Sequence, residues 1–225
     1  PFAVAGLNDV LENYGARTCN LRDLSLPEVM AFAKGKDYVD SRTLIARTKT
    51  DSDYSKNNSL LKTLYKLAEE ELGNVKGPFM VEGFTFVLNS NDKNCYGLTL
   101  IKKPDFKIIQ DERLDGKYSG KTFSSVDELG LPSFDKNGNR TWYARNDSLS
   151  RVCLLRDLGL VSDFRYLADS NDDGRVVCLS AEGVAQNLLE KNVQRIQEER
   201  NKTREEYIAK LNSLKMEIDK ELKGN

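Results

Sequence analysis

The sequence contains no histidine, and this absence excludes a large part of enzyme chemistry. Without His there is no Ser-His-Asp or Cys-His activation of a nucleophile, no imidazole general base and no imidazole metal ligand. Catalysis would have to rely on carboxylate pairs, Lys, Tyr, or a metal held by oxygen and thiolate ligands. P-loop, GxGxxG and GxSxG motifs are also missing. We therefore expect a non-enzymatic binding or structural protein, without a cofactor.

Long apolar runs and paired cysteines are missing as well. No stretch approaches the roughly 18 apolar residues that a membrane-spanning helix needs, so we expect no membrane span. The four cysteines form no CxxC pair, which argues against a thiolate zinc site, and we expect no metal centre of this kind. Buried thiols are the simpler interpretation of these cysteines, which are Cys19, Cys95, Cys153 and Cys178.

Charge of one sign is not in excess. The chain has 34 Lys and Arg against 35 Asp and Glu, whereas a general nucleic-acid binder would show a clear basic excess. We therefore expect no nucleic-acid partner. Charged residues make up 31% of the chain, which suggests a solvated, charged element. Residue 1 is Pro rather than Met, so we expect the native N-terminus to be missing, and the localisation stays open.

The first half of the chain predicts two helices. Ser25 and Pro27 are typical of a helix start, and Gly35 would end that helix. An amphipathic pattern predicts a second helix over residues 59–72, with Gly73 in the position of a C-terminal cap.

Strand-forming residues dominate after the second helix. Residues 78–88 and 95–101 predict a hairpin, and 106–109 a further short strand. Two more strands are expected at 140–144 and 174–179, the last of them central because it has little polar face.

The last part of the chain predicts one long charged helix. It holds no Pro, and its apolar residues approach a spacing of three and four. We therefore expect an α+β domain over residues 1–180, followed by a C-terminal helix over 181–225. Such a helix lies across its own domain or pairs with a second copy. The apolar residues of the stripe are Ile196, Tyr207, Leu211, Leu214 and Ile218.

Residues 143–181 lack Lys, Glu, Gln, Met and Trp altogether, yet the segment carries six Asp and five Arg. When an Asn codon is mutated at its first two bases, the third base stays a pyrimidine. Such codons encode every amino acid except those five. A segment diversified at adenines from an Asn-rich template would therefore have this composition.

The segment resembles the variable region of proteins made by diversity-generating retroelements, most closely those of archaeal type. The resembling residues run from Trp142-Tyr143-Ala144-Arg145 through Leu149-Ser150-Arg151-Val152 and Leu167-Ala168 to Gly174-Arg175-Val176-Val177. The resemblance covers about a fifth of the chain. It implies a C-type-lectin fold with antiparallel sheets, and a hypervariable face, within about 143–180, that binds an unknown protein or cell-surface ligand. The long helix after the segment departs from the bacterial and phage pattern, in which the variable region ends the protein.

Alternation within the segment predicts which side chains face the ligand. Val152 and Leu154 would point inward while their neighbours Arg151, Cys153 and Leu155 are free to vary. Tyr, Arg and Phe are typical of binding hot spots. The predicted ligand-binding positions are Cys153, Leu155, Asp157, Gly159, Val161, Phe164, Arg165, Tyr166, Asp169, Asp172 and Asp173.

Two alternatives remain open at this point. Residues 169–174 (DSNDDG) match the start of a calcium-binding loop, although Ser180 stands where a bidentate Glu is required. That pattern favours a calcium-dependent structural or adhesive module. The other alternative is a coiled-coil scaffold that self-associates through the C-terminal helix.

Overall fold

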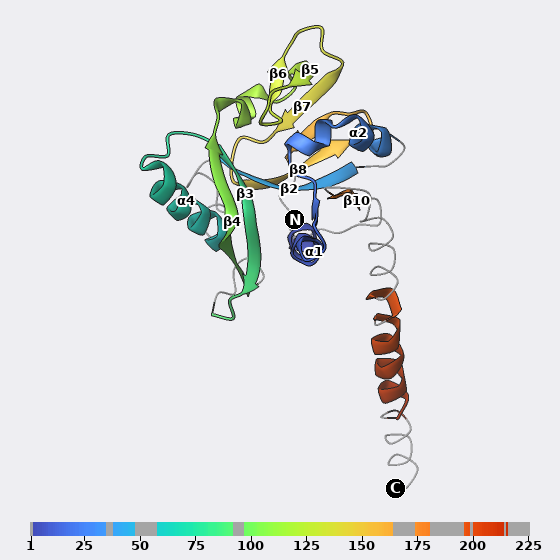
Figure 1. Cartoon of the computed structure of the whole chain (residues 1–225). Helices are drawn as coiled ribbons and strands as arrows, with labels where there is room; N and C mark the ends of the chain where they lie inside the picture. Colours follow the sequence, from blue (N-terminus) through green and yellow to red (C-terminus); the bar gives the residue numbers. More distant parts are fainter. Residues whose placement is uncertain are drawn as a thin grey trace. The chain divides into compact units, whose positions relative to one another are not determined.

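The computed structural model describes residues 2–34, 38–47, 58–91, 97–163, 174–180, 196–198, 200–213 and 215. The chain divides into two compact units, Pro1–Leu179 and Ser180–Asn225, and each is described here by itself. The first unit mixes helices with antiparallel and mixed sheets, which confirms the α+β class (Figure 1).

The main sheet of the first unit has β2 and β8 at its centre. Most neighbouring strands are antiparallel, but β7 pairs with β9 in parallel, and β10 (Gly174–Val176) pairs in parallel with β2. In spatial order the strands are β4 (Leu98–Gln110), β3 (Phe79–Leu88), β2 (Tyr38–Ala46), β8 (Leu149–Leu155), β9 (Leu160–Ser162), β7 (Arg140–Ala144), β5 (Thr122–Val126) and β6 (Pro132–Phe134). A second, two-stranded sheet joins β1 (Ala16–Thr18) to β11 (Cys178–Ser180).

Apolar clusters cover both faces of this sheet. Successive strand residues point to opposite faces, and in β2 Ile45 belongs to one cluster while Leu44 and Ala46 belong to the other. The first cluster includes the buried Trp142, and the second packs against α4. Strands β2 and β8 are therefore buried on both sides, which decides the environment of residues 149–155.

Three α-helices lie in the described part of the first unit, where two were expected. They are α1 (Phe2–Glu12), α2 (Pro27–Ala33) and α4 (Ser59–Leu72). The helix at 59–72 is confirmed with both ends. Asn58 accepts a hydrogen bond from the Leu61 amide at its start, and Gly73 adopts φ 75° at its end.

The sequence did not predict α1, and it misplaced the start of α2. Ser25 ends the 3₁₀ helix η1 (Arg22–Ser25), and Leu26 takes the N-cap position of α2 without a side-chain hydrogen bond. Pro27 is in the first turn, as expected. Gly35 lies outside the described residues. Two further 3₁₀ helices are η3 (Glu112–Leu114) and η4 (Gly116–Tyr118).

The hairpin of β3 and β4 is confirmed, with α4 beside it (Figure 1). A separate strand at 106–109 is wrong, because β4 continues through Pro104 to Gln110. Since β4 is the edge strand, the missing N–H of Pro104 removes no bond from the ladder. The expected central strand at 174–179 is also wrong. That stretch divides into the short, half-buried strands β10 and β11, and neither is central in the main sheet.

Ser180, the last residue of β11, is the first described residue of the C-terminal unit, and the other described residues of this unit are helical. The helical residues comprise 196–198, 200–213 and 215, and all of these side chains are exposed. No helix in the described part of the chain is long and apolar enough to cross a membrane.

Candidate functional site

Strand β8 does not have the free face that its alternation predicted. Val152 and Leu154 are buried in the core, as expected, but Arg151 and Cys153 on the other face are 3% and 0% exposed. Both faces of the central strands are covered, so alternation along β8 does not separate core from surface. Only Leu155, at the end of the strand, is partly exposed.

Two buried polar side chains of β8, Arg151 and Cys153, bind Asp40 of β2. Arg151 Nη1 donates to Asp40 Oδ2 at 2.7 Å, and its guanidinium lies 5.0 Å from the centre of the Tyr38 ring. The Cys153 thiol donates to Asp40 Oδ1 at 3.4 Å, and burial raises the pKa of this thiol. A buried ion pair that loses one partner leaves an uncompensated charge, so these residues are coupled rather than freely exchangeable.

The expected ligand-binding positions therefore separate into three groups. Asp157 is exposed and Leu155 is half-buried. The predicted exposure is wrong for three positions, which are buried: Cys153, Gly159 and Val161. The positions outside the described residues are Phe164, Arg165, Tyr166, Asp169, Asp172 and Asp173. The proposed calcium loop at 169–174 also lies outside them, except for Gly174.

The turn between β8 and β9 has a closed backbone. The Leu155 amide donates to Gly159 O at 2.9 Å, and the Leu158 amide donates to Leu155 O at 2.9 Å. Leu158 adopts φ 65°, a left-handed conformation that is costly for a side chain of this kind. Asp157 Oδ1 accepts from the Gly159 amide at 2.9 Å. Three hydrogen bonds thus hold a turn of only a few residues.

A buried arginine anchors this turn from below. Arg140 is 6% exposed, and its Nε donates to Leu158 O at 2.7 Å. Its guanidinium lies 4.6 Å from the centre of the Phe123 ring, and burial lowers the pKa of this side chain. Arg140 belongs to β7, outside the segment that resembles a variable region. The position of the turn therefore depends on a residue that is not part of the exposed tip.

Side chains at the tip of this turn form a small exposed surface. Arg156 and Asp157 are exposed, and Arg156 makes no hydrogen bond or ion pair with the described residues. A Cβ added at Gly159 would lie 3.1 Å from Asp157 Oδ1 and 3.4 Å from Tyr143 Cε2, which places Tyr143 beside the tip. We name Tyr143, Leu155, Arg156 and Asp157 the turn surface. The sequence-based set of ligand-binding positions included neither Arg156 nor Tyr143.

A second buried arginine holds the turn at the other end of β8. The Arg47 amide donates to Ser148 O at 3.0 Å, which fixes the turn between β7 and β8. Its guanidinium donates to Leu114 O at 2.7 Å, to Ser150 Oγ at 2.7 Å and to Ser162 Oγ at 3.0 Å. Burial, together with the nearby Arg145, lowers the pKa of Arg47. Arg47 thus ties four segments together at this end of β8.

Side chains of the β7–β8 turn bind one another rather than remaining free. Arg145 Nη2 donates to Asp147 Oδ1 at 2.7 Å, and the Arg145 side chain is only 10% exposed. Ser148 is fully buried at φ 68°, and its hydroxyl has no hydrogen-bond partner among the described residues. This turn offers less exposed polar surface than the β8–β9 turn.

No protein family, curated protein or solved structure matches this chain.

Proposed function

We propose that the first unit is a non-enzymatic recognition domain that binds an unknown protein or cell-surface ligand through the turn surface. In this proposal the segment 143–180 is the hypervariable region of a retroelement-diversified protein, and the domain is C-type-lectin-like. The composition of the segment and its resemblance to such regions support this identity. The structure contributes the α+β class and a candidate surface.

One observation carries the proposal. The β8–β9 turn is held by backbone hydrogen bonds and by Arg140 from below, whereas its tip exposes Arg156 and Asp157. A surface that accepts many side chains needs a backbone fixed by residues other than the ones that vary. Exposed Tyr and Arg side chains also supply the contacts that most often dominate protein–protein recognition. The turn surface meets both requirements at Tyr143, Leu155 and Arg156, whereas the Asp157 side chain also supports the turn by accepting from the Gly159 amide.

The first test concerns the coding DNA. We expect a near-repeat of the segment encoding 143–181 close to a reverse-transcriptase gene, with differences concentrated at adenines of the repeat. Within the repeat, substitutions should fall at the codons of Leu155, Arg156 and Asp157 more often than at those of the buried Arg151 and Cys153. A genomic neighbourhood with no repeat and no reverse transcriptase would contradict the retroelement assignment.

The second test concerns tolerance of the fold. One library randomises Leu155, Arg156 and Asp157, and a matched library randomises the buried Arg151, Cys153 and Val161. Both are displayed and scored by resistance to a protease. We expect most members of the first library and few members of the second to remain resistant. Equal loss of resistance in the two libraries would show that the turn surface cannot serve as a variable binding site.

A third test asks whether the tolerant surface can bind. Resistant members of the first library are selected against immobilised hen egg lysozyme as a probe protein. We expect selected clones to bind lysozyme with sequences that differ only at the randomised positions. If selection returns no binder from a fully folded library, the turn surface does not provide enough contact for recognition.

A further inference from the structure

The C-terminal helix carries one side that is both apolar and basic. Successive residues of an α-helix are rotated by about 100°, so residues three and four apart share a side. This spacing brings Arg200 and Arg204 onto the side of Tyr207 and Leu211, whose side chains are 67% and 64% exposed. We name this side the helix stripe. Its described members are Ile196, Gln197, Arg200, Arg204, Tyr207, Ile208 and Leu211.

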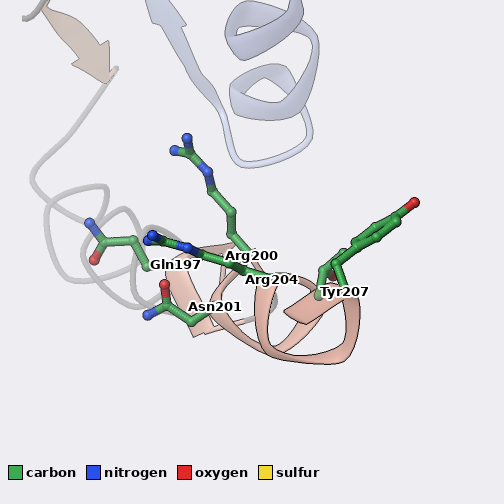
Figure 2. Close-up of a pocket in the computed structure, with 6 residues that line it drawn as sticks. Gln197, Arg200, Asn201, Arg204 and Tyr207 are labelled. Atoms are coloured by element: carbon green, nitrogen blue, oxygen red, sulfur yellow. The ribbon is translucent and has the colours of Figure 1, made fainter. Parts of the chain in front are cut away.

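A hollow of about 820 Å³ lies along the N-terminal half of the helix stripe. The described residues that line it are Gln197, Arg200, Asn201, Thr203, Arg204 and Tyr207. Figure 2 shows Arg200 and Arg204 extending from neighbouring turns of the helix, with Gln197 and Asn201 close by. None of these lining residues is acidic, so two guanidinium groups face the hollow without a carboxylate among them.

The described acidic residues of the helix are confined to one side. Glu198, Glu205 and Glu206 lie on the side opposite the stripe, at about 100° to 200° from Arg204 around the axis. Arg200 and Arg204 form no ion pair within the described residues, whereas surface helices commonly pair such charges at i,i+4. The stripe is therefore a basic and apolar surface, and the described acidic residues of the helix lie on the other side.

This charge pattern decides which occupant fits. In a parallel, in-register pair of two copies, Arg200 would face Arg200 and Arg204 would face Arg204, and such like-charge pairs oppose association. In any register, the described stripe of a second copy has no carboxylate that could pair with Arg200 or Arg204. A small ligand is also a poor fit, since ligand sites are usually concave and mostly apolar, while this hollow is lined by polar groups of one helix.

We propose that the helix stripe is a docking surface for an acidic amphipathic helix of another protein. Carboxylates of that helix, one turn apart, would face Arg200 and Arg204, and its apolar residues would pack on Tyr207 and Leu211. Arg binds carboxylates through two parallel hydrogen bonds, so two such contacts add orientation to the apolar contact. This interaction is independent of the recognition function proposed for the first unit.

The experiment uses the full chain and two fluorescein-labelled synthetic peptides of about four heptads. Both peptides have Leu at the seam, and they carry either Glu or Lys at the positions that flank it. Fluorescence anisotropy is measured at low and at high salt. We expect the Glu peptide to bind at least about tenfold more tightly than the Lys peptide, with a difference that shrinks at high salt. Equal affinities for the two peptides would overturn the proposal.

A matched pair of variants locates the contact. Arg204→Glu reverses one charge on the stripe, and Lys202→Glu makes the same charge change on the opposite side of the same helix. We expect Arg204→Glu to weaken binding of the Glu peptide about tenfold and Lys202→Glu to leave it within about twofold. Equal effects would indicate long-range attraction rather than docking on the stripe. Self-association of the chain without peptide, weakened by Arg204→Glu in sedimentation velocity, would overturn the proposal in favour of a second copy.

Discussion

The two turns that flank β8 are both anchored by a buried arginine, but the two anchors differ in how completely they are satisfied. Arg47 places all three guanidinium nitrogens within 3.0 Å of an acceptor. Arg140 makes one short bond, from Nε to Leu158 O, and a long one of 3.4 Å to Ser25 Oγ. Its Nη2 is buried without a partner.

This difference indicates a division of roles between the two ends of the strand. At the β7–β8 turn, every guanidinium nitrogen of the anchor makes a hydrogen bond, and the turn's own Arg145 and Asp147 bind each other. At the β8–β9 turn, the backbone is held, but Arg156 stays free of described partners. The first end therefore contributes mainly to stability, while the second combines a fixed backbone with an exposed tip.

Replacing Arg47 with Leu should give the largest loss of stability. Leu114 O would lose its side-chain donor, although Ser150 and Ser162 can still bond each other at 2.8 Å. Part of the loss is offset, because the buried charge is removed as well. We expect the free energy of unfolding to fall by about 3 kcal/mol, measured by urea unfolding followed by circular dichroism.

Arg47→Lys is the control that keeps the positive charge but loses the hydrogen-bond geometry of the guanidinium. A Lys ammonium keeps the charge but cannot reproduce the planar fork that reaches three separate acceptors. We expect the free energy of unfolding of Arg47→Lys to lie between those of the wild type and Arg47→Leu. A loss below about 1 kcal/mol for Arg47→Leu would mean that this end of β8 is not the more strongly anchored one.

Replacing Arg140 with Leu should cost less, about 1 to 2 kcal/mol. The variant loses the hydrogen bond to Leu158 O and the contact with the Phe123 ring, but it also removes the unsatisfied Nη2. We expect faster hydrogen exchange at the amides of Leu158 and Gly159, with little change in β2. A loss as large as that of Arg47→Leu would make the two anchors equivalent.

Glycine substitutions at the two turns should change the stability of the protein in opposite directions. Ser148 and Leu158 both adopt φ near 65°, which glycine accepts without strain. Ser148→Gly also removes a buried hydroxyl that lacks a partner, so we expect a gain of about 1 kcal/mol. Leu158→Gly removes a side chain that packs against the core, so we expect a loss of about 1 kcal/mol. A gain at both positions in thermal unfolding would show that backbone strain governs both, and a loss at both would show that the lost side-chain contacts outweigh strain.

Local patterns in the sequence were sufficient for some elements and insufficient for others. The helix over 59–72 is specified by its own spacing and caps, and it was predicted with both ends. The buried residues of α1 also share one side, at Val4, Ala5, Asn8 and Leu11, so a periodicity test over the first turns could have found that helix.

The environment of β8 depended on contacts that sequence spacing does not contain. Alternation places Cys153 on the face opposite to that of Leu154, but both are buried because packing covers both faces of the sheet at β8. The roles of the two anchoring arginines are even harder to predict from the sequence. Arg47 binds Leu114 and Ser162, which are 67 and 115 residues away, so no local pattern could assign its role. The composition of 143–181 indicated where to look, while the exposed positions within it required the fold.

The smallest effects are expected at the tip of the β8–β9 turn. Arg156→Ala removes an exposed side chain without a described partner, so we expect a change in stability within about 0.5 kcal/mol. Asp157→Ala removes the acceptor of the Gly159 amide, so we expect a loss of about 0.5 to 1 kcal/mol. Urea unfolding of both variants beside Arg140→Leu would rank the three contributions. If Arg156→Ala proved the most destabilising, the tip would be part of the turn's own support, and a fixed backbone with exchangeable side chains would no longer describe this end of β8.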